Sequence, residues 1–308
     1  MKNYMDEDDF NFEYDESDEP ESKSLRRIGI VIGVGVLILT ICGISAVRSV
    51  KSASNEENGL NGANTSLQDG VMYEDGYEPT QYYTENDSDT SLLKTYMDYN
   101  EDVVAMIRIN DSVLNHPIMY TPADEGYYLN RDLNKEHNSH GVPFLSIGSD
   151  LSRVSGNNII YGHNIRLNGL DVFADLNNYR DIEYYKEHPI VEIITEDGTS
   201  RWLIFAYYLV DTSDTDTFIY FDNTEFVSMQ DYEWYMGEVS RRSWINVPIE
   251  NTIDDAYITL SSCSVELHGS GTNRMVVMAR RLEVGEEYED IVSSATLNPN
   301  PLLPMKLR

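Results

Sequence analysis

Hydrophobic residues beyond position 100 fall into short runs rich in Val, Ile, Tyr and Phe, separated by clusters of Gly, Asn, Asp and Ser. Runs of this length and composition are typical of β-strands. Eight short strands favour a closed or nearly closed β-barrel, so the predicted fold class is mainly β. The eight segments are Val103 to Ile109, His116 to Thr121, Val142 to Ile147, Asn157 to Asn164, Ile190 to Gly198, Arg201 to Asp211, Tyr257 to Cys263 and Arg274 to Leu282.

Helical spacing of apolar residues occurs in three other places. The stretch "SLLKTYMDYNEDV" predicts a short helix from Ser91, at the start of the folded region. Asp171 to Lys186 and Asn223 to Ile245 predict two further helices, each with an apolar side that we interpret as core packing. Those apolar positions are Val172, Leu176 and Tyr179 in the first, and Phe226, Met229, Tyr232, Met236 and Val239 in the second.

Residues Ile28 to Val47 form an uncharged, apolar run of 20 residues. At helical rise such a run spans about 30 Å, the thickness of the hydrocarbon core of a bilayer. The run therefore predicts a transmembrane helix. A cleaved signal peptide is the alternative, but the run begins late, is longer than a usual signal core and lacks a clean small-residue cleavage site.

Basic residues flank this run almost evenly, so they give only a slight preference for orientation. The long segment that follows contains no second span, which favours a signal anchor with a cytoplasmic amino terminus and the rest of the chain outside the cell. The predicted organisation is an acidic disordered tail (1–27), the membrane anchor (28–47), an extracellular linker (48–90), a folded domain (91–285) and a Pro-rich tail outside the core (286–308).

Charge is strongly negative, with a formal net charge of -31. Met1 to Ser22 contains ten acids and one lysine, and Ser52 to Thr90 contains nine acids and no base, so much of the surplus lies outside the folded domain. No cluster of Lys or Arg follows these segments that would bind a phosphate backbone. Nucleic acid is therefore excluded as a partner.

The chain has two cysteines, and Cys42 lies in the apolar run, so no disulfide can form within the extracellular part. Cys263 stands alone at the end of a predicted strand. A cysteine is nucleophilic as the thiolate, which needs a cationic or hydrogen-bonding neighbour. The alternative for Cys263 is a small buried hydrophobe.

Two residues are candidate neighbours of Cys263. Arg274 begins the next strand, so a hairpin would bring its guanidinium near a carbonyl bound at the sulfur, although a solvated charge at a strand end is the simpler interpretation. His163 follows the apolar strand "NNIIYGHN" and would present its imidazole at a barrel rim, unless it is a structural histidine. Arg280 and Arg281, deeper in the strand of Arg274, are weaker candidates.

Other chemistry has little support in the sequence. His137 and His140 lie in an Asn- and Ser-rich loop without nearby cysteines or paired acids, which does not favour a metal site. The chain contains no Walker loop, dinucleotide fingerprint, CxxC pair or G-x-S-x-G motif. No cofactor and no metal are predicted.

Three motifs, in this order and spacing, resemble those of the sortase family: "IIYGHN" with His163, "TLSSC" with Cys263 and "RMVVMAR" with Arg274. The resemblance covers roughly Ser91 to Leu282. The helix before the barrel, the long helix before the nucleophile strand and "EGYYLNRD" make it similar to class B in particular. The chain departs from the family at Ser262, usually Thr, and at Ser264, often an acid in class B.

This resemblance implies an eight-stranded sortase barrel with accessory helices and a cysteine transpeptidase of a Gram-positive-type envelope. Cys263 would attack a sorting signal of a secreted protein to form a thioacyl enzyme, which an amino group of a cell-wall peptide resolves. His163 would be general acid and then general base, and Arg274 would stabilise the oxyanion or hold the substrate. Residues lining the peptide groove would be Leu129, Tyr161, Ser261 and Ser262.

Two alternatives to the transpeptidase stay open at this point. A hydrolytic cysteine peptidase would use the same residues but release the acyl group to water. A membrane-tethered binding protein, without enzymatic activity, would merely bury Cys263.

Overall fold

The computed structural model describes residues 82–84, 86–164, 172–214, 218–222, 224–263 and 272–307. The apolar run 28–47, the acidic segment before it and most of the linker after it lie outside these ranges. Among the helices in the described ranges, none combines the length and the apolar character needed to cross a membrane.

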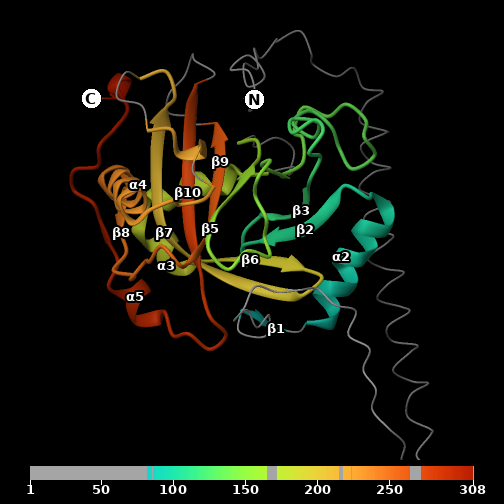
Figure 1. The fold of residues 1–308 in the computed structure, drawn as a ribbon, viewed down its shortest axis with the longest axis horizontal. Helices are drawn as coiled ribbons and strands as arrows, with labels where there is room; N and C mark the ends of the chain where they lie inside the picture. Colours follow the sequence, from blue (N-terminus) through green and yellow to red (C-terminus); the bar gives the residue numbers. More distant parts are fainter. Residues whose placement is uncertain are drawn as a thin grey trace, which may run out of the picture. The chain divides into compact units, whose positions relative to one another are not determined.

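Eight strands form the predicted closed barrel (Figure 1). Their order is β7-β10-β9-β5-β4-β3-β2-β6, and pairing of β6 with β7 closes the ring. The pairs β3–β4 and β5–β9 are parallel, and the other six are antiparallel. The strands are β2 (Val103–Arg108), β3 (Asn115–Met119), β4 (Phe144–Leu145), β5 (Gly156–Tyr161), β6 (Ile190–Thr195), β7 (Gly198–Asp211), β9 (Ala256–Cys263) and β10 (Asn273–Arg281).

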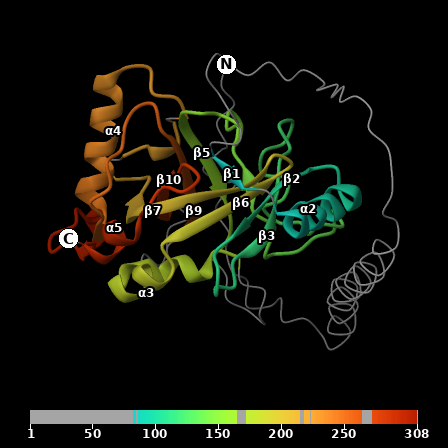
Figure 2. The same ribbon diagram turned by 90° about the horizontal axis from the view of Figure 1, so that it is seen from below.

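Both faces of the longest strands are covered, which explains their unbroken apolar sequences. On β10, Met275 and Val277 belong to the main core cluster, whereas Val276 and Met278 belong to a second cluster with residues of α4 (Met229–Arg242). Successive side chains of a strand point to opposite faces, so alternate residues join the two clusters. Figures 1 and 2 show α4 on one side of the barrel and α2 on the opposite side.

Helix α2 (Asp87–Tyr99) begins before the predicted Ser91, because Asn86 caps it by accepting from the backbone N–H groups of Ser88 and Asp89. A short strand, β1 (Tyr83–Thr84), precedes it and pairs with β7. Within the described residues, ordered structure therefore begins several residues earlier than the pattern predicts. The carboxylate of Asp89, on the first turn of α2, pairs with Arg108 of β2 at 2.9 Å and fixes the helix to the barrel.

The helix predicted from Asp171 to Lys186 is divided into a 3-10 helix, η3 (Ala174–Arg180), and α3 (Ile182–Glu187). Asp181 separates them, since its extended backbone and its side-chain bond to the N–H of Glu183 start a new helix. The predicted core residues of this segment, Val172, Leu176 and Tyr179, are buried.

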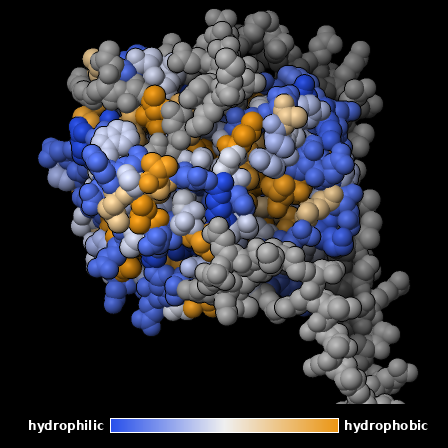
Figure 3. Space-filling view, viewed as in Figure 1, coloured by the Kyte–Doolittle hydropathy of each residue, from blue (hydrophilic) through white to orange (hydrophobic). Residues whose placement is uncertain are grey.

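The long helix α4 occupies the centre of the predicted range Asn223 to Ile245, with Ser228 as its N-cap. Of its predicted apolar side, Tyr232 and Val239 are buried, but Met229 lies in the first turn and is 53% exposed. Tyr235 packs in the core instead. In Figure 3 the hydrophobic residues on the visible face form separate patches among hydrophilic ones.

The tail predicted to lie outside the core instead packs against it. Residues after 286 form α5 (Glu289–Ser293), β11 (Thr296–Leu297) and a 3-10 turn, η5 (Met305–Leu307). Val292 and Ala295 are buried in the main core, and β11 pairs with β8 (Ile245–Asn246). Pro-rich composition predicted the irregular backbone but gave no sign of these apolar contacts.

Candidate functional site

Three neighbouring strands bring the predicted residues to one end of the barrel. Because β5 and β9 run parallel, with Tyr161 opposite Ser261, both strands end at the same rim. β10 begins there, and its Arg274 is paired with Cys263 across the antiparallel ladder. The predicted hairpin register is therefore correct for the backbone of Cys263.

A small cavity opens at this rim. Among the side chains that the structure describes, six predicted site residues line it together with Gly162: Leu129, Tyr161, Gly162, His163, Ser261, Ser262 and Arg274. Leu129 comes from the long loop between β3 and β4, far from the others in sequence. The fold thus assembles residues that the sequence places more than 140 positions apart.

Two polar contacts hold His163 in place, one at its backbone carbonyl and one at its ring. The backbone N–H of Phe173 donates to the carbonyl of His163 at 2.9 Å. The ring Nε2 lies 2.8 Å from the carbonyl oxygen of Leu129. A carbonyl oxygen only accepts, so Nε2 carries a proton, and Nδ1 is the ring nitrogen left for proton transfer.

Burial lowers the pKa of His163 below its ordinary value. The hydrogen bond to the Leu129 carbonyl opposes this shift, while the nearby His140 and Arg274 lower the pKa further. The imidazole is therefore mainly neutral at neutral pH. Protonation of His163 becomes easier when a negative charge appears beside it.

Arg274 is 8% exposed at the rim, and its Nη1 donates to the carbonyl of Asn273 at 3.0 Å. The cation shifts the pKa of both His163 and Tyr161, so it lies within electrostatic range of each. A guanidinium stays charged at all relevant pH values and presents several donors. This arrangement differs from the solvated strand-end charge that was the simpler interpretation.

The two serines before Cys263 have distinct partners. Ser262 donates its hydroxyl to the carbonyl of Gly162 at 2.6 Å, which ties β9 to the residue before His163. The hydroxyls of Ser261 and Tyr220 lie 2.6 Å apart. Ser262 thus retains the hydroxyl of the threonine usual in the family and uses it to align the histidine strand.

Three neighbours of the site were not predicted as such from the sequence: Tyr220, His140 and Gly141. Tyr220 sits in a 3-10 turn, η4 (Tyr220–Asp222), and is buried beside Ser261. A Cβ on Gly162 would lie 2.8 Å from the ring of Phe173. These are tertiary contacts, so no local pattern signals them.

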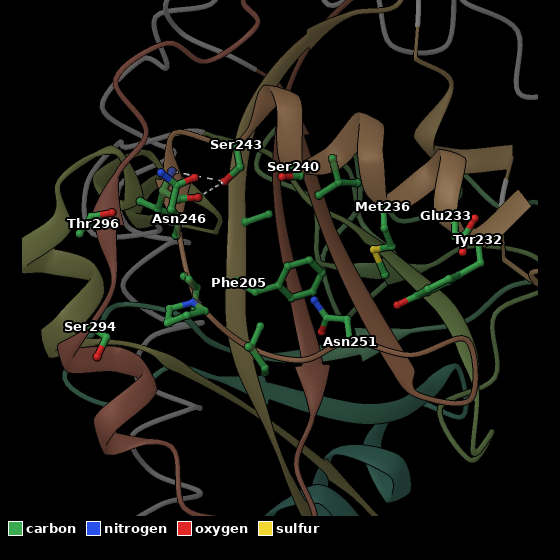
Figure 4. A pocket seen from close by; sticks show the side chains of 16 residues that line it. Phe205, Tyr232, Glu233, Met236, Ser240, Ser243, Asn246, Asn251, Ser294 and Thr296 are labelled. Carbon is green, nitrogen blue, oxygen red and sulfur yellow. Dashed lines mark hydrogen bonds between the residues drawn. The ribbon is translucent and has the colours of Figure 1, made fainter. Parts of the chain in front are cut away.

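A second, larger cavity of about 590 Å³ lies under α4. The side chains of Tyr232 and Met236 extend from α4 toward Phe205 and Asn251 (Figure 4). None of the six predicted site residues whose side chains are described lines this cavity. It is therefore a separate place from the rim at which β5, β9 and β10 meet.

Comparison of the sequence with protein-family models found no match. Sortase B of Staphylococcus aureus (strain NCTC 8325 / PS 47) is 30% identical over 185 residues, covering 60% of this chain and 72% of that protein. Sortase B of Listeria monocytogenes serovar 1/2a is 31% identical over 176 residues, covering 56% and 68%. The chain belongs to the class B sortases.

Solved class B sortases have the same fold. A Staphylococcus aureus sortase B–substrate complex and a sortase B complexed with triglycine each match with a TM-score of 0.55 and 28% identity, covering 64% of this chain and 87% of theirs. The resemblance predicted from the three motifs is thereby confirmed. Membership in this sortase class implies a cysteine transpeptidase that acts at the cell surface.

Proposed function

We propose that this sortase cleaves a sorting signal of secreted proteins through a thioacyl intermediate on Cys263 and joins the product to an amine of the cell wall. The observation that carries the proposal is the meeting of His163, the Cys263 backbone and Arg274 at one rim, on three adjacent strands. The substrate and triglycine complexes of other sortases support a peptide substrate and an amino-terminal amine as acceptor.

In the first half-reaction the Cys263 thiol passes its proton to Nδ1 of His163, and the thiolate so formed attacks the carbonyl carbon of the scissile peptide. Arg274 donates to the oxyanion that forms, and its buried position strengthens that interaction. When the C–N bond breaks, His163 gives a proton to the departing amine. The developing charges favour this transfer even though the resting imidazole is mainly neutral.

In the second half-reaction the acceptor amine attacks the thioester and gives its proton to His163. The C–S bond breaks and the thiolate leaves, which regenerates the enzyme. The same nitrogen, Nδ1, serves both transfers, because Nε2 is engaged with the Leu129 carbonyl. Leu129, Tyr161, Ser261 and Ser262 line the groove beside the reacting bond.

The remaining parts of the chain fit this role. Residues 28–47 anchor the enzyme in the membrane with the amino terminus inside, and the residues between 47 and β1 are the linker to an extracellular catalytic domain. Secreted substrates emerge at that face of the membrane. Of the two alternatives, the hydrolytic peptidase differs only in its acceptor, and the binding protein predicts an inert Cys263.

The test is mass spectrometry of the purified full-length chain after incubation with a library of sorting-signal peptides, with and without triglycine. We expect a thioacyl adduct on Cys263 that transfers to triglycine. Cys263→Ala should abolish the adduct, and Arg274→Ala should reduce turnover at least about 10²-fold. Arg280→Ala is the matched control, since Arg280 pairs with Glu286 and lies 3.7 Å from Asp255, away from the rim.

Two results would redirect the proposal. Adducts that pass only to water, whatever the concentration of triglycine, would support the hydrolytic peptidase. An unmodified thiol with every peptide, in a protein that unfolds cooperatively, would support the binding protein.

A further inference from the structure

The segment 289–307 runs along α4 to the end of the barrel where β9 ends and β10 begins (Figure 1). Backbone bonds fix its course: Asn298 donates to the carbonyl of Trp244, and Leu302 donates to that of Arg241, each at 2.8 Å. Both carbonyls lie at the carboxyl end of α4, where backbone acceptors lack partners within the helix, so the segment supplies their hydrogen-bond donors. The segment is therefore firmly placed on the barrel.

At the rim the segment meets Asp211, the last residue of β7. The Lys306 ammonium lies 2.8 Å from the carboxylate of Asp211, whose side chain is 0% exposed. The backbone N–H of Met305 donates to Asp214 at 2.7 Å. Burial raises the pKa of Asp211, but Lys306, Ser213 and Thr272 outweigh it and hold the pKa well below its ordinary value.

The same carboxylate holds the beginning of β10. The hydroxyl of Thr272 donates to Asp211 at 2.7 Å, and the carbonyl of Thr272 accepts from the N–H of Thr212 at 2.9 Å. Asn273 is then paired with Asp211 in the ladder, and its carbonyl accepts from the Arg274 guanidinium at 3.0 Å. An unbroken set of contacts connects Lys306 to Arg274.

We propose that Lys306, through Asp211 and Thr272, is a positioning residue that fixes the start of β10 and thereby the guanidinium of Arg274. This inference rests on the proposed function of Arg274 as the group that binds the oxyanion. Without the Lys306 cation, the ionised form of the buried Asp211 carboxylate becomes much less favourable, and nothing on that side holds the carboxylate in place. Loss of Lys306 therefore loosens Thr272 and lets Arg274 shift from the position that the oxyanion requires.

The inference predicts a defect in turnover rather than in substrate binding. Displacement of a positioning group by about 1 Å costs up to about 10²-fold in rate. Lys306 is 49% exposed, so water already screens part of its interaction with Asp211. We therefore expect Lys306→Ala to lower kcat about tenfold and to leave KM within about twofold. Lys306→Arg keeps the charge and should restore most of kcat.

The experiment uses the full-length chain and two readouts. The first is kcat and KM for peptide transfer to triglycine, measured well below the unfolding temperature of each variant. Lys94→Ala is the matched control, because it removes the same group from an exposed pair with Asp98 on α2. Thr272→Val should lower kcat as well, and the double variant with Lys306→Ala should be no worse than the more affected single variant.

The second readout is hydrogen exchange of the backbone at the start of β10, which needs no activity. We expect faster exchange at Asn273 and Arg274 in Lys306→Ala than in wild type or Lys94→Ala. Unchanged exchange there overturns the inference, and so does a wild-type kcat in Lys306→Ala. A wild-type chain that transfers no peptide at all refutes the proposed function instead, and the exchange result then still decides whether Lys306 holds the strand.

Discussion

Gly141→Ala tests whether the Leu129 carbonyl orients the imidazole of His163, which we propose to be catalytic. Gly141 has φ +58, and a Cβ there would lie 2.4 Å from the carbonyl oxygen of Leu129 and 2.6 Å from that of Tyr128. An ordinary contact between such atoms needs about 3.4 Å, so the Leu129 carbonyl must retreat by about 1 Å. Its bond to Nε2 of His163, now 2.8 Å, would then exceed the limit of a hydrogen bond.

The expected effects can be separated into stability and turnover. A non-glycine residue in the left-handed region costs about 1–2 kcal/mol, and the lost hydrogen bond adds about 1 kcal/mol. General acid–base catalysis contributes about 10²–10⁴-fold, so an imidazole that turns away from its productive orientation should lower kcat roughly tenfold to a hundredfold. KM should change little.

The assay is steady-state transfer of a sorting-signal peptide to triglycine by the full-length chain, beside thermal unfolding. Gly285→Ala is the control, since Gly285 has φ +85 but a Cβ there meets nothing within 4 Å. The control has the backbone strain without the clash, so it should lose stability and keep kcat. If Gly141→Ala also keeps the wild-type kcat, the Leu129 carbonyl has no part in orienting His163.

Three further outcomes follow from the site. Gly162→Ala should destabilise the protein by about 1–3 kcal/mol, because its Cβ would lie 2.8 Å from the Phe173 ring, and the loss in thermal unfolding should shrink in a Phe173→Leu background. Tyr220→Phe removes the hydroxyl that lies 2.6 Å from Ser261 and should raise KM more than it lowers kcat; an unchanged KM would argue against Ser261 as a groove residue. The pKa of His163 in the folded state is below its unfolded value of about 6.5. Neutral His163 therefore contributes to the free energy of unfolding above that pH, and this contribution is lost as the pH falls. Denaturant unfolding at several pH values should therefore show a smaller loss between about pH 7.5 and 5.5 for His163→Gln than for wild type.

All eight barrel strands could be predicted because their sequences carry a strong signal. Strands such as β7 and β10 have both faces covered, so each contains an unbroken apolar or aromatic run, Trp202 to Val210 in β7 and Met275 to Ala279 in β10. The strands β1, β8 and β11 were missed, since two residues carry no period, whereas the equally short β4 lies inside the longer apolar run Val142 to Ile147. Helix ends were displaced where a single side chain decided them, as Asn86 does for α2.

The predicted site residues were recognisable by chemical type and by their place in family motifs, but their partners were not. The acceptor for His163 is a backbone carbonyl, which has no signature in the side-chain sequence. Tyr220 and Lys306 reach the rim from segments whose local patterns indicate only a loop and a tail. Such contacts depend on how the barrel closes and on what packs around it, so they become visible only in three dimensions.

Two of the three arginines of β10, Arg274 and Arg280, illustrate the limit of residue type as evidence. Arg274 and Arg280 are separated by an even number of residues in the same strand, so alternation alone puts them on one face. Their positions in the ladder separate them: Arg280 is paired with Tyr257 and has the carboxylates of Asp255 and Glu286 beside it, whereas Arg274 is paired with Cys263. Two carboxylates already offset the positive charge of Arg280, so its guanidinium would stabilise an oxyanion only weakly. For this reason Arg280 is structural in our proposal and Arg274 is catalytic.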